Sequence, residues 1–206
     1  KEDLIKLVKK NSKRKNEKVK KSKNGGYTNT PTLTRKFIDY FSKTKETSDV
    51  KKNNLIRTNE NIKELVKLWC ERPNVIEKYF GHIREWNTSQ VTDMSELFYH
   101  VPDPEYKGSY QYIENDQLEG IENWDVSNVS NMKGMFMKVR EFNQPIGSWN
   151  VSNVTNMEYM FNKAEAFNQL IGSWDVSKVT NREYMFYQAE AFNQPIGNWD
   201  VSKVTN

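Results

Sequence analysis

Residues 149–173 read WNVSNVTNMEYMFNKAEAFNQLIGS, and residues 174–198 repeat them almost letter for letter as WDVSKVTNREYMFYQAEAFNQPIGN. An earlier copy occupies residues 124–148, and a further copy begins at Trp199. Tryptophan therefore recurs at a fixed interval of 25 residues over this part of the chain. A period between about 20 and 50 residues is the signature of a repeat architecture in which neighbouring units stack on one another.

Each copy carries the pattern of a strand followed by a short helix. In the copy at residues 149–173, Val151 and Val154 flank an extended piece, because alternating β-branched residues favour strands. The segment from Thr155 to Glu158 has the pattern of a helix-capping box. Apolar residues follow at helical spacing, at positions 157, 160, 161 and 164. The sequence therefore predicts an α/β repeat solenoid whose strands stack in parallel, about 4.8 Å apart.

The first unit begins before the most regular copies. Trp86 opens it, because the interval from tryptophan to the phenylalanine of the unit is twelve residues in every copy, here from Trp86 to Phe98. The interval from Trp86 to Trp124 is 38 residues, so the first unit carries an insertion of 13, which we place within residues 100–118. The last unit stops at Asn206, after its strand, so we expect further repeats in the natural protein, or else dimerisation or fraying at this edge. The predicted solenoid covers residues 86–206, with coils that start at 86, 124, 149, 174 and 199.

An amphipathic helix precedes the first unit. Apolar residues lie on one face of it, at positions 62, 65, 66 and 69. Asn61 and Glu64 have the spacing of a capping box, Pro73 ends the helix, and a further turn of helix closes at Gly81. Because a stack of repeats needs its open end covered, we interpret residues 58–85 as a helical N-terminal cap.

The N-terminal quarter of the chain differs in composition from the rest. Residues 1–32 are read as a basic, largely disordered arm, because so polar a segment cannot offset its ordering entropy. Residues 33–57 are read as a short helix over 33–42 and a polar linker. Eleven Lys or Arg stand against three acidic residues in residues 1–23, whereas residues 86–206 carry eight against sixteen. The chain therefore joins a basic arm to an acidic body.

Residues typical of catalysis are scarce. His82 and His100 are the only histidines, and the single cysteine, Cys70, excludes an internal disulfide. No Ser/His/Asp set, metal-ligand spacing or glycine-rich phosphate loop is present. We therefore expect no enzymatic activity and no cofactor, with Cys70 packed in the cap. No apolar run has the length of about 20 residues that spans a bilayer, and no signal peptide is visible.

Three periodic features each allow a structural and a functional interpretation. Asparagines recur at 131, 156 and 181 and at 143, 168 and 193, which predicts ladders that satisfy backbone groups of neighbouring coils, or else a ligand ladder. Aspartates at 125, 175 and 200 share one position and form a solvated acidic face or a calcium row, which Asn87 and Asn150 would interrupt. Arg182 replaces a methionine, so its guanidinium either reaches the rim of the stack or forms an anion site.

These repeats resemble the BspA-like leucine-rich-repeat family, the mycoplasma-type surface lipoprotein repeat. The unit of that family reads close to W-D-V-S-N-V-T-N-M-x-x-M-F-x-x-A-x-x-F-N-Q-P-I-G, which residues 149–172 and 174–197 match nearly throughout. The resemblance covers residues 58–206 or so, and it departs from the pattern at Arg182, at Leu170 and in the insertion. It implies a leucine-rich-repeat-like stack of strand-plus-short-helix coils with a helical cap. It also implies a surface-exposed or secreted recognition protein that acts in adhesion or host contact.

Two functions follow as hypotheses. The first is a non-enzymatic recognition module, whose unknown protein or glycan partner binds the coils and the aromatic insertion. The candidate partner-binding residues are Tyr106, Tyr110 and Tyr112. The second is a scaffold tethered to nucleic acid or an anionic surface by the basic arm, with binding that falls steeply with salt and with no base stacking. The candidate residues of this arm are Lys9, Lys10, Lys13, Arg14, Lys15, Lys18, Lys20, Lys21 and Lys23.

Overall fold

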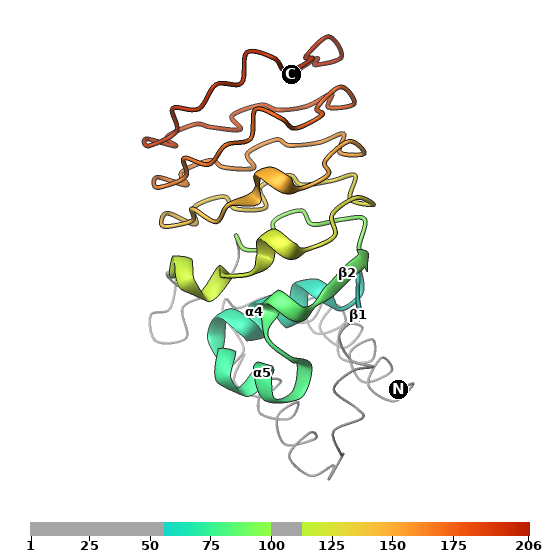
Figure 1. Ribbon diagram of the computed structural model, residues 1–206, viewed down its shortest axis with the longest axis vertical. Helices are drawn as coiled ribbons and strands as arrows, with labels where there is room; N and C mark the ends of the chain where they lie inside the picture. The colour runs from blue at the N-terminus through green and yellow to red at the C-terminus, as the bar shows by residue number, and fades with distance from the viewer. Residues whose placement is uncertain (1–55, 100–112) are drawn as a thin grey trace, which may run out of the picture. The chain divides into compact units, whose positions relative to one another are not determined.

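The computed structural model describes residues 56–99 and 113–206 (Figure 1). The chain divides into two compact units, Lys1–Lys43 and Thr44–Asn206, and every described residue lies in the second. This unit opens with a small helical cap and continues as successive coils, each of which we define as starting at its tryptophan. Coils 1 to 5 therefore start at Trp86, Trp124, Trp149, Trp174 and Trp199.

The cap consists of helices α4 (Ile62–Glu71) and α5 (Pro73–Phe80). The predicted apolar stripe of α4 is buried, and Leu68 and Cys70 are buried with it. Pro73 does more than end α4, because it occupies the first turn of α5, where its missing N–H leaves no bond unmade. Gly81 then ends α5 with a positive φ of 72°, a conformation that glycine adopts at little cost.

The predicted capping box at the start of α4 does not form. Asn61 lies at the N-cap position, but its side chain makes no capping hydrogen bond. Its Oδ1 instead accepts the N–H of Thr58 at 3.1 Å, and its own N–H donates to the Thr58 carbonyl at 3.1 Å. Asn61 therefore closes the turn between the preceding strand and the helix.

That strand is β1 (Ile56–Thr58), which pairs in parallel with β2 (Asn87–Gln90) at the start of coil 1. Its central residue, Arg57, is 1% exposed, although the sequence places it in a polar linker. The guanidinium carbon lies 4.3 Å from the centroid of the Trp86 ring, and Nη2 donates to the Phe80 carbonyl at 3.0 Å. The folded unit thus begins at least two residues before the predicted cap.

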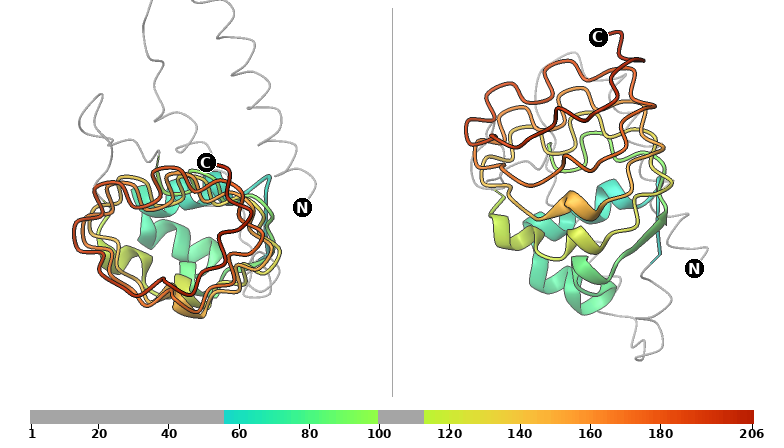
Figure 2. Two further views of the ribbon diagram at one scale, coloured as in Figure 1. Left: turned by 90° about the horizontal axis from the view of Figure 1, so that it is seen from above. Right: turned by 45° about the horizontal axis from the view of Figure 1, so that its top comes forward.

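Beyond β2 the coils lie over one another when they are viewed along the stack (Figure 2, left). One residue of each coil forms a parallel bridge with the next coil, and these bridges join Asp93, Asn131, Asn156 and Asn181 in order. A column of serine and threonine hydroxyls runs alongside these bridges. Its members are Thr92, Ser130, Thr155, Thr180 and Thr205. From Ser130 onward, each member of this column donates its N–H to the carbonyl of the member one coil earlier, at 2.8 to 2.9 Å.

The first four members of this hydroxyl column immediately precede a bridge residue in the chain, as Ser130 precedes Asn131. The hydroxyl groups of Ser130, Thr155, Thr180 and Thr205 donate to the same carbonyls as the N–H groups, at 3.1 to 3.3 Å. The column therefore fixes the register of neighbouring coils twice, once through the backbone and once through the side chain.

The short helix predicted after each bridge does not form, and a run of turns takes its place. In coil 2 every second N–H donates to a carbonyl of coil 3 at 2.7 to 3.0 Å. Of the N–H groups between them, those of Met135 and Met137 donate to the carbonyl three residues earlier, and that of Lys133 donates to Oδ1 of Asn131. Because half of the N–H groups bond sideways, the i to i−4 bonds of an α-helix cannot form. The donors to coil 3 are Met132, Gly134, Phe136 and Lys138.

Side chains that point into the coils form columns of rings. Phe98, Phe136, Phe161 and Phe186 stack with ring centroids 5.3, 5.8 and 5.6 Å apart. A second column contains Phe142, Phe167 and Phe192, at 5.7 and 5.8 Å. Each phenylalanine that is fully buried in this way contributes about 1.5–3 kcal/mol. The core is therefore shared between coils, and no coil can bury its own face alone.

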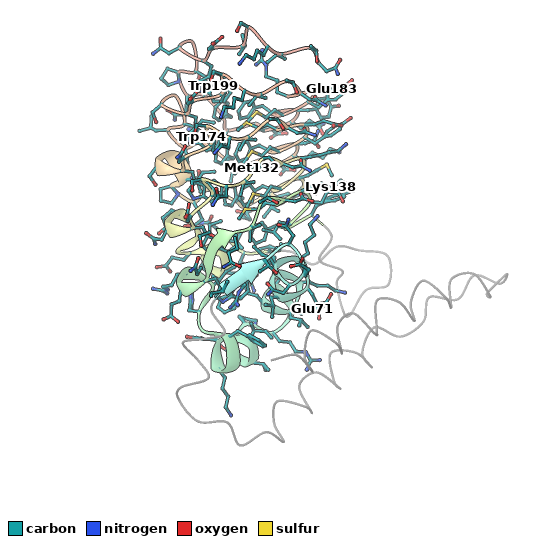
Figure 3. All side chains as sticks on the ribbon, turned by 90° about the vertical axis from the view of Figure 1, so that its right-hand side faces the viewer. Glu71, Met132, Lys138, Trp174, Glu183 and Trp199 are labelled. Carbon is teal, nitrogen blue, oxygen red and sulfur yellow. The ribbon has the colours of Figure 1, made fainter. Side chains whose placement is uncertain are left out.

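The tryptophans tie each coil to the one before it. Trp174 and Trp199 stack with parallel rings at 6.4 Å, on the side of the stack away from Glu183 and Lys138 (Figure 3). The indole N–H of Trp174 donates to the Ile146 carbonyl at 3.3 Å, and that of Trp199 donates to the Ile171 carbonyl at 3.2 Å. The same bond recurs at Trp124 and Trp149.

Short 3-10 helices and glycines shape the return of each coil toward the next tryptophan. The 3-10 helices are η1 (Ile83–Glu85), η2 (Asn115–Leu118), η3 (Ile121–Asn123) and η4 (Ile146–Ser148). A Cβ on Gly172 would collide with the Pro195 carbonyl of the following coil, and one on Gly147 would collide with the Leu170 carbonyl. The backbones of successive return loops therefore touch at these glycines. Among the described helices, none is long and apolar enough to cross a lipid bilayer.

Candidate functional site

The run of turns forms one exposed side of the stack, which we call the turn face and define as residues 95–99, 133–138, 158–163 and 183–188. Left-handed backbone recurs along it, with φ of 55° at Tyr159 and 51° at Tyr184. Non-glycine residues adopt this conformation at a cost of about 1–2 kcal/mol. The sideways hydrogen bonds between coils offset that cost. The side chains of Glu183 and Lys138 project from this face in Figure 3.

Tyrosines gather at the coil 3 and coil 4 end of the turn face. Tyr184 and Tyr187 are each 51% exposed. The Tyr184 ring stacks on that of Tyr159 at 5.5 Å and meets that of Tyr187 edge-on at 5.7 Å. Aromatic rings of this kind combine a large apolar area with a polar end, and they are enriched at binding hot spots. This cluster was not predicted from the sequence, although coils 3 and 4 both read Glu-Tyr-Met-Phe shortly after the bridge residue.

Charged side chains flank the tyrosines. Lys133 Nζ lies 2.9 Å from a carboxylate oxygen of Glu158, and this contact raises the pKa of the lysine. The same carboxylate accepts the side-chain N–H of Asn181 at 3.1 Å. Partial burial, and then the carboxylates of Glu183 and Glu158, raise the pKa of the Tyr159 hydroxyl. The tyrosine therefore stays protonated and is available as a hydrogen-bond donor at neutral pH.

Described residues stand on both sides of the insertion of coil 1. Tyr99 precedes the insertion, and its ring lies 5.2 Å from Nζ of Lys138. Ile113 is 5% exposed at the other end, so the last residues of the predicted insertion are part of the core. Asn115 follows, accepting the N–H of Asn143 on Oδ1 at 2.8 Å and the side-chain N–H of Gln144 on its carbonyl at 2.6 Å.

Asn115 extends a ladder that the sequence predicts only for 143, 168 and 193. Oδ1 of Asn143 accepts the N–H of Asn168 at 3.0 Å, and Oδ1 of Asn168 accepts that of Asn193 at 2.9 Å. These side chains join neighbouring coils, as the structural interpretation predicts. The other column differs, because Oδ1 of Asn156 accepts the N–H of Glu158 within its own coil at 2.9 Å. Asn131 and Asn181 do the same.

The predicted row of aspartates serves local turns. Asp125 Oδ1 accepts both the N–H and the hydroxyl of Ser127, at 3.0 and 2.6 Å, and these bonds lower the pKa of the carboxyl group. Asn150 makes the same two bonds to Ser152, so the turn does not require a charge. Among the described residues no group of three His, Cys, Asp or Glu side chains could hold a metal ion. The geometry therefore favours the solvated face over the calcium row.

Cys70 and His82 pack as structural residues in the cap. Burial raises the pKa of the Cys70 thiol to about 12, so the nucleophilic thiolate is absent at neutral pH. The His82 ring lies 4.8 Å from that of Trp69, and its Nδ1 accepts the N–H of Arg84 at 3.3 Å. The indole N–H of Trp69 donates to the Gln117 carbonyl at 2.8 Å, which links the cap to the end of the insertion.

Arg182 is half-buried in the position that Met132 and Met157 occupy in the preceding coils. Its Nε is buried and has no hydrogen-bond partner within the described residues. The sequence predicts that the Arg182 guanidinium reaches the rim of the stack. The structure differs in part, because Nε stays buried within the stack.

The candidate binding residues from the sequence lie outside the described part of the chain. Tyr106, Tyr110 and Tyr112 fall within residues 100–112, and His100 falls there too. The nine cationic residues of the arm, from Lys9 to Lys23, fall within residues 1–55. The two candidate sites from the sequence therefore stay predictions.

Comparison with known proteins gives one match. The family described as "Mycoplasma protein of unknown function, DUF285" matches residues 38–103 and 105–206. The search of curated proteins returns no match. The search of solved structures returns none either.

Proposed function

The chain belongs to the family of Mycoplasma proteins of unknown function DUF285, and we propose that it is a non-enzymatic recognition module that contacts a protein or glycan at a cell surface. In this proposal the coils are a leucine-rich-repeat-like solenoid of the BspA type. The turn face and the insertion of coil 1 carry the binding. Adhesion or host contact is the role that the resemblance of the repeats suggests.

The observation that carries the proposal is the tyrosine cluster of the turn face. Tyr184 and Tyr187 expose half of their surface, whereas the phenylalanine rings of coils 2 and 3 are buried. Exposing such rings to water is unfavourable for the isolated protein, and a partner that covers them recovers that free energy. Tyr99, the last described residue before the insertion, belongs to the same turn face.

Two features of the described residues support a non-enzymatic role. Cys70 is buried with its thiol protonated, and His82 packs edge-on against Trp69. The polar ladders engage their side chains with the backbone, as Asn168 and Asn143 do. The side chains of these ladders therefore hold the stack together and are not arranged around a reacting group.

The tyrosine cluster gives a direct test. We expect the chain to bind at least one of three immobilised probes, namely mucin, fibronectin and heparin, in surface plasmon resonance. The double variant Tyr184→Ser with Tyr187→Ser should lose at least about tenfold in affinity, because two partly exposed rings leave the interface. The matched control is Leu170→Ser, which removes an apolar side chain that is 70% exposed on the return loop, and it should bind as the parent does.

Equal affinity of the double variant and the parent would contradict the assignment of the turn face. The insertion needs its own variant, in which residues 100–112 are replaced by a short Gly/Ser linker. Ile113 and Asn115 are retained in it, because the core and the asparagine ladder use them. This variant should keep the melting temperature and lose affinity, and loss of folding would show that the insertion is structural.

The alternative function rests on the basic arm, and the salt dependence of binding separates the two. A full-length variant with Gln at all nine cationic positions of the arm is compared with the parent on duplex DNA, RNA and heparin. A tether should bind in the parent alone and weaken steeply between about 50 and 200 mM salt. Recognition by the turn face should survive both the arm variant and the salt.

A further inference from the structure

Side chains of three successive coils meet at a carboxylate of the turn face. Nζ of Lys133 in coil 2 lies 2.9 Å from Oε2 of Glu158 in coil 3. Nδ2 of Asn181 in coil 4 donates to the same oxygen at 3.1 Å. An amine and a carboxamide that belong to coils 2 and 4 therefore both contact one oxygen atom of coil 3.

The packing of the coils holds these three groups in place. The Glu158 side chain is 15% exposed and that of Lys133 is 39% exposed, while Asn181 is half-buried. The backbone of Asn181 forms a parallel bridge with Asn156, and its carbonyl accepts the N–H of Met157 at 2.8 Å. Fixing reactive groups beside one another lowers the entropic cost of a reaction between them.

The carboxamide of Asn181 has a donor on its oxygen. Oδ1 accepts the backbone N–H of Glu183 at 3.0 Å. Such a donor stabilises the negative charge that develops on a carbonyl oxygen when a nucleophile adds to its carbon. A lysine amine is a nucleophile once it has lost a proton, and a neighbouring carboxylate can accept that proton. The site thus combines a nucleophile, an acid–base group and a polarised carbonyl.

We propose that Lys133 and Asn181 form an intramolecular amide bond, with Glu158 transferring the protons. The product would link coils 2 and 4 covalently across coil 3. The single cysteine of the chain cannot form an internal disulfide, so this bond would be a different covalent connection between coils. The proposal does not depend on the recognition function, because it rests on contacts within the stack.

The reaction balances without a cofactor or an oxidant. The contact with Glu158 raises the pKa of Lys133, so the amine starts as an ammonium ion and first passes a proton to the Glu158 carboxylate. The lone pair of the amine then forms a bond to Cγ of Asn181, and the electron pair of the C=O bond moves onto Oδ1. Glu158 returns its proton to Nδ2 and accepts a second proton from the attacking nitrogen. The C=O bond re-forms as the Cγ–Nδ2 bond breaks, and ammonia leaves and carries the second proton away as ammonium.

Mass spectrometry of the full 206-residue chain tests the proposal directly. After several days of incubation in the folded state, the intact protein should be lighter than its sequence by one ammonia. A tryptic digest should contain the peptide 179–182 joined through Asn181 to a peptide in which Lys133 is not cleaved. The variants Glu158→Gln and Lys133→Arg should both have the full mass of their sequences, because the first lacks the acid–base group and the second lacks the amine.

A second lysine–asparagine pair serves as an internal control. Nζ of Lys178 donates to Oδ1 of Asn153 at 2.7 Å, but among the described residues no carboxylate forms an ion pair with this lysine. The side-chain N–H of Asn153 donates to the Ser127 carbonyl instead. This pair should stay unlinked in the same digest, although its contact is direct.

Thermal unfolding gives an independent measurement. A covalent link between distant residues restricts the unfolded chain, as a disulfide does, so Lys133→Arg should melt about 10 °C below the parent. Arginine keeps the positive charge beside Glu158, so the loss of the ion pair contributes little to this shift. An intact mass equal to that of the sequence, or an ammonia loss that maps to other residues, would overturn the proposal. Persistence of the link in Glu158→Gln would overturn the role of the carboxylate.

Discussion

At the scale of single residues, the tightest constraint lies where the return loops of successive coils touch. Gly147 and Gly172 occur at the same position of coils 2 and 3, and in each case the carbonyl of the next coil occupies the space of a Cβ. Gly197 is the equivalent residue of coil 4, and a Cβ there would meet nothing within 4 Å. The chain thus offers a constrained glycine and an unconstrained one in the same local sequence.

Gly172→Ala should destabilise the protein by about 1–3 kcal/mol, because the added methyl group forces the loops of coils 3 and 4 apart. For a protein of this size that corresponds to a drop in melting temperature of about 2–12 °C. Gly197→Ala should leave the melting temperature unchanged within about 1 °C. Differential scanning fluorimetry of both variants checks this, and an equal shift in the two would contradict the packing described for Gly172.

Residues also show why the predicted helix fails. Met157, Met160, Phe161 and Ala164 are all buried, so the apolar spacing in the sequence identifies the core correctly. The same spacing suits a run of turns, because every third or fourth side chain again points inward. Only the backbone distinguishes the two, through sideways bonds such as that from the Phe161 N–H to the Met185 carbonyl. Such a bond joins residues 24 apart, and no local pattern reveals it.

At the scale of elements, strand β1 joins the cap to the coils through its pairing with β2 and through the side chain of Arg57. Arg57 covers the Trp86 ring, which itself stacks on Trp124 at 6.3 Å, so the guanidinium ends the tryptophan column. Burial lowers the pKa of this arginine to about 10. The desolvation that lowers the pKa also opposes folding, and the contacts with Trp86 and the Phe80 carbonyl offset it.

Arg57→Ala should therefore destabilise the protein by about 3–5 kcal/mol, because it leaves a cavity beside Trp86 and removes the hydrogen bond from the guanidinium to the Phe80 carbonyl. Arg57→Met should cost much less, since a methionine fills the same space without a buried charge. Urea denaturation followed by tryptophan fluorescence measures both. If methionine were as damaging as alanine, the charge and not the packing would hold this junction.

The elements of the cap could largely be predicted from the sequence, whereas the insertion could not. The apolar stripe of α4 is buried as expected, and Gly81 closes α5. Ile56 and Arg57 were assigned to a linker, because a three-residue strand has no periodicity of its own. Asn115 was not predicted as a member of the asparagine ladder, because the insertion shifts it out of the 25-residue register. In the structure it still accepts the N–H of Asn143, as the other members do in their coils.

At the scale of the whole molecule, repetition multiplies small electrostatic effects. Asp125, Asp175 and Asp200 each accept hydrogen bonds from the serine two residues later, and these bonds lower the pKa of each carboxyl group. A carboxyl group with a lowered pKa in the folded state contributes stability above its unfolded pKa and loses it as the pH falls through its folded pKa. The three groups together should make the stack acid-sensitive below about pH 4.

The triple variant Asp125→Asn, Asp175→Asn and Asp200→Asn should fold normally at pH 7, because Asn87 and Asn150 already make the same turn in coils 1 and 3. Its urea midpoint should fall less between pH 5 and pH 3 than that of the parent, since an asparagine does not titrate. Parallel denaturation curves at both pH values provide the measurement. An unchanged pH dependence in the variant would show that these turns do not contribute to acid sensitivity.

Only part of the candidate site could be predicted from the sequence. The sequence repeats identify the family and the core residues, because both depend on residue type at a fixed period. The turn face could not be predicted, because Tyr184 and Tyr187 look like one face of the expected helix. The backbone is left-handed at Tyr184 and Gln188, and this conformation interrupts any helical face.

The sideways bonds of the coils also decide how the stack behaves as it grows. On the turn face alternate N–H groups point toward the following coil, as that of Gly134 does toward the Glu158 carbonyl. In the hydroxyl column they point toward the preceding coil, as Thr155 does toward Ser130. The peptide dipoles of the two sides therefore oppose each other, unlike those of an α-helix, which add along its axis. An array of these coils therefore accumulates less partial charge at its ends than one whose peptide dipoles all point the same way.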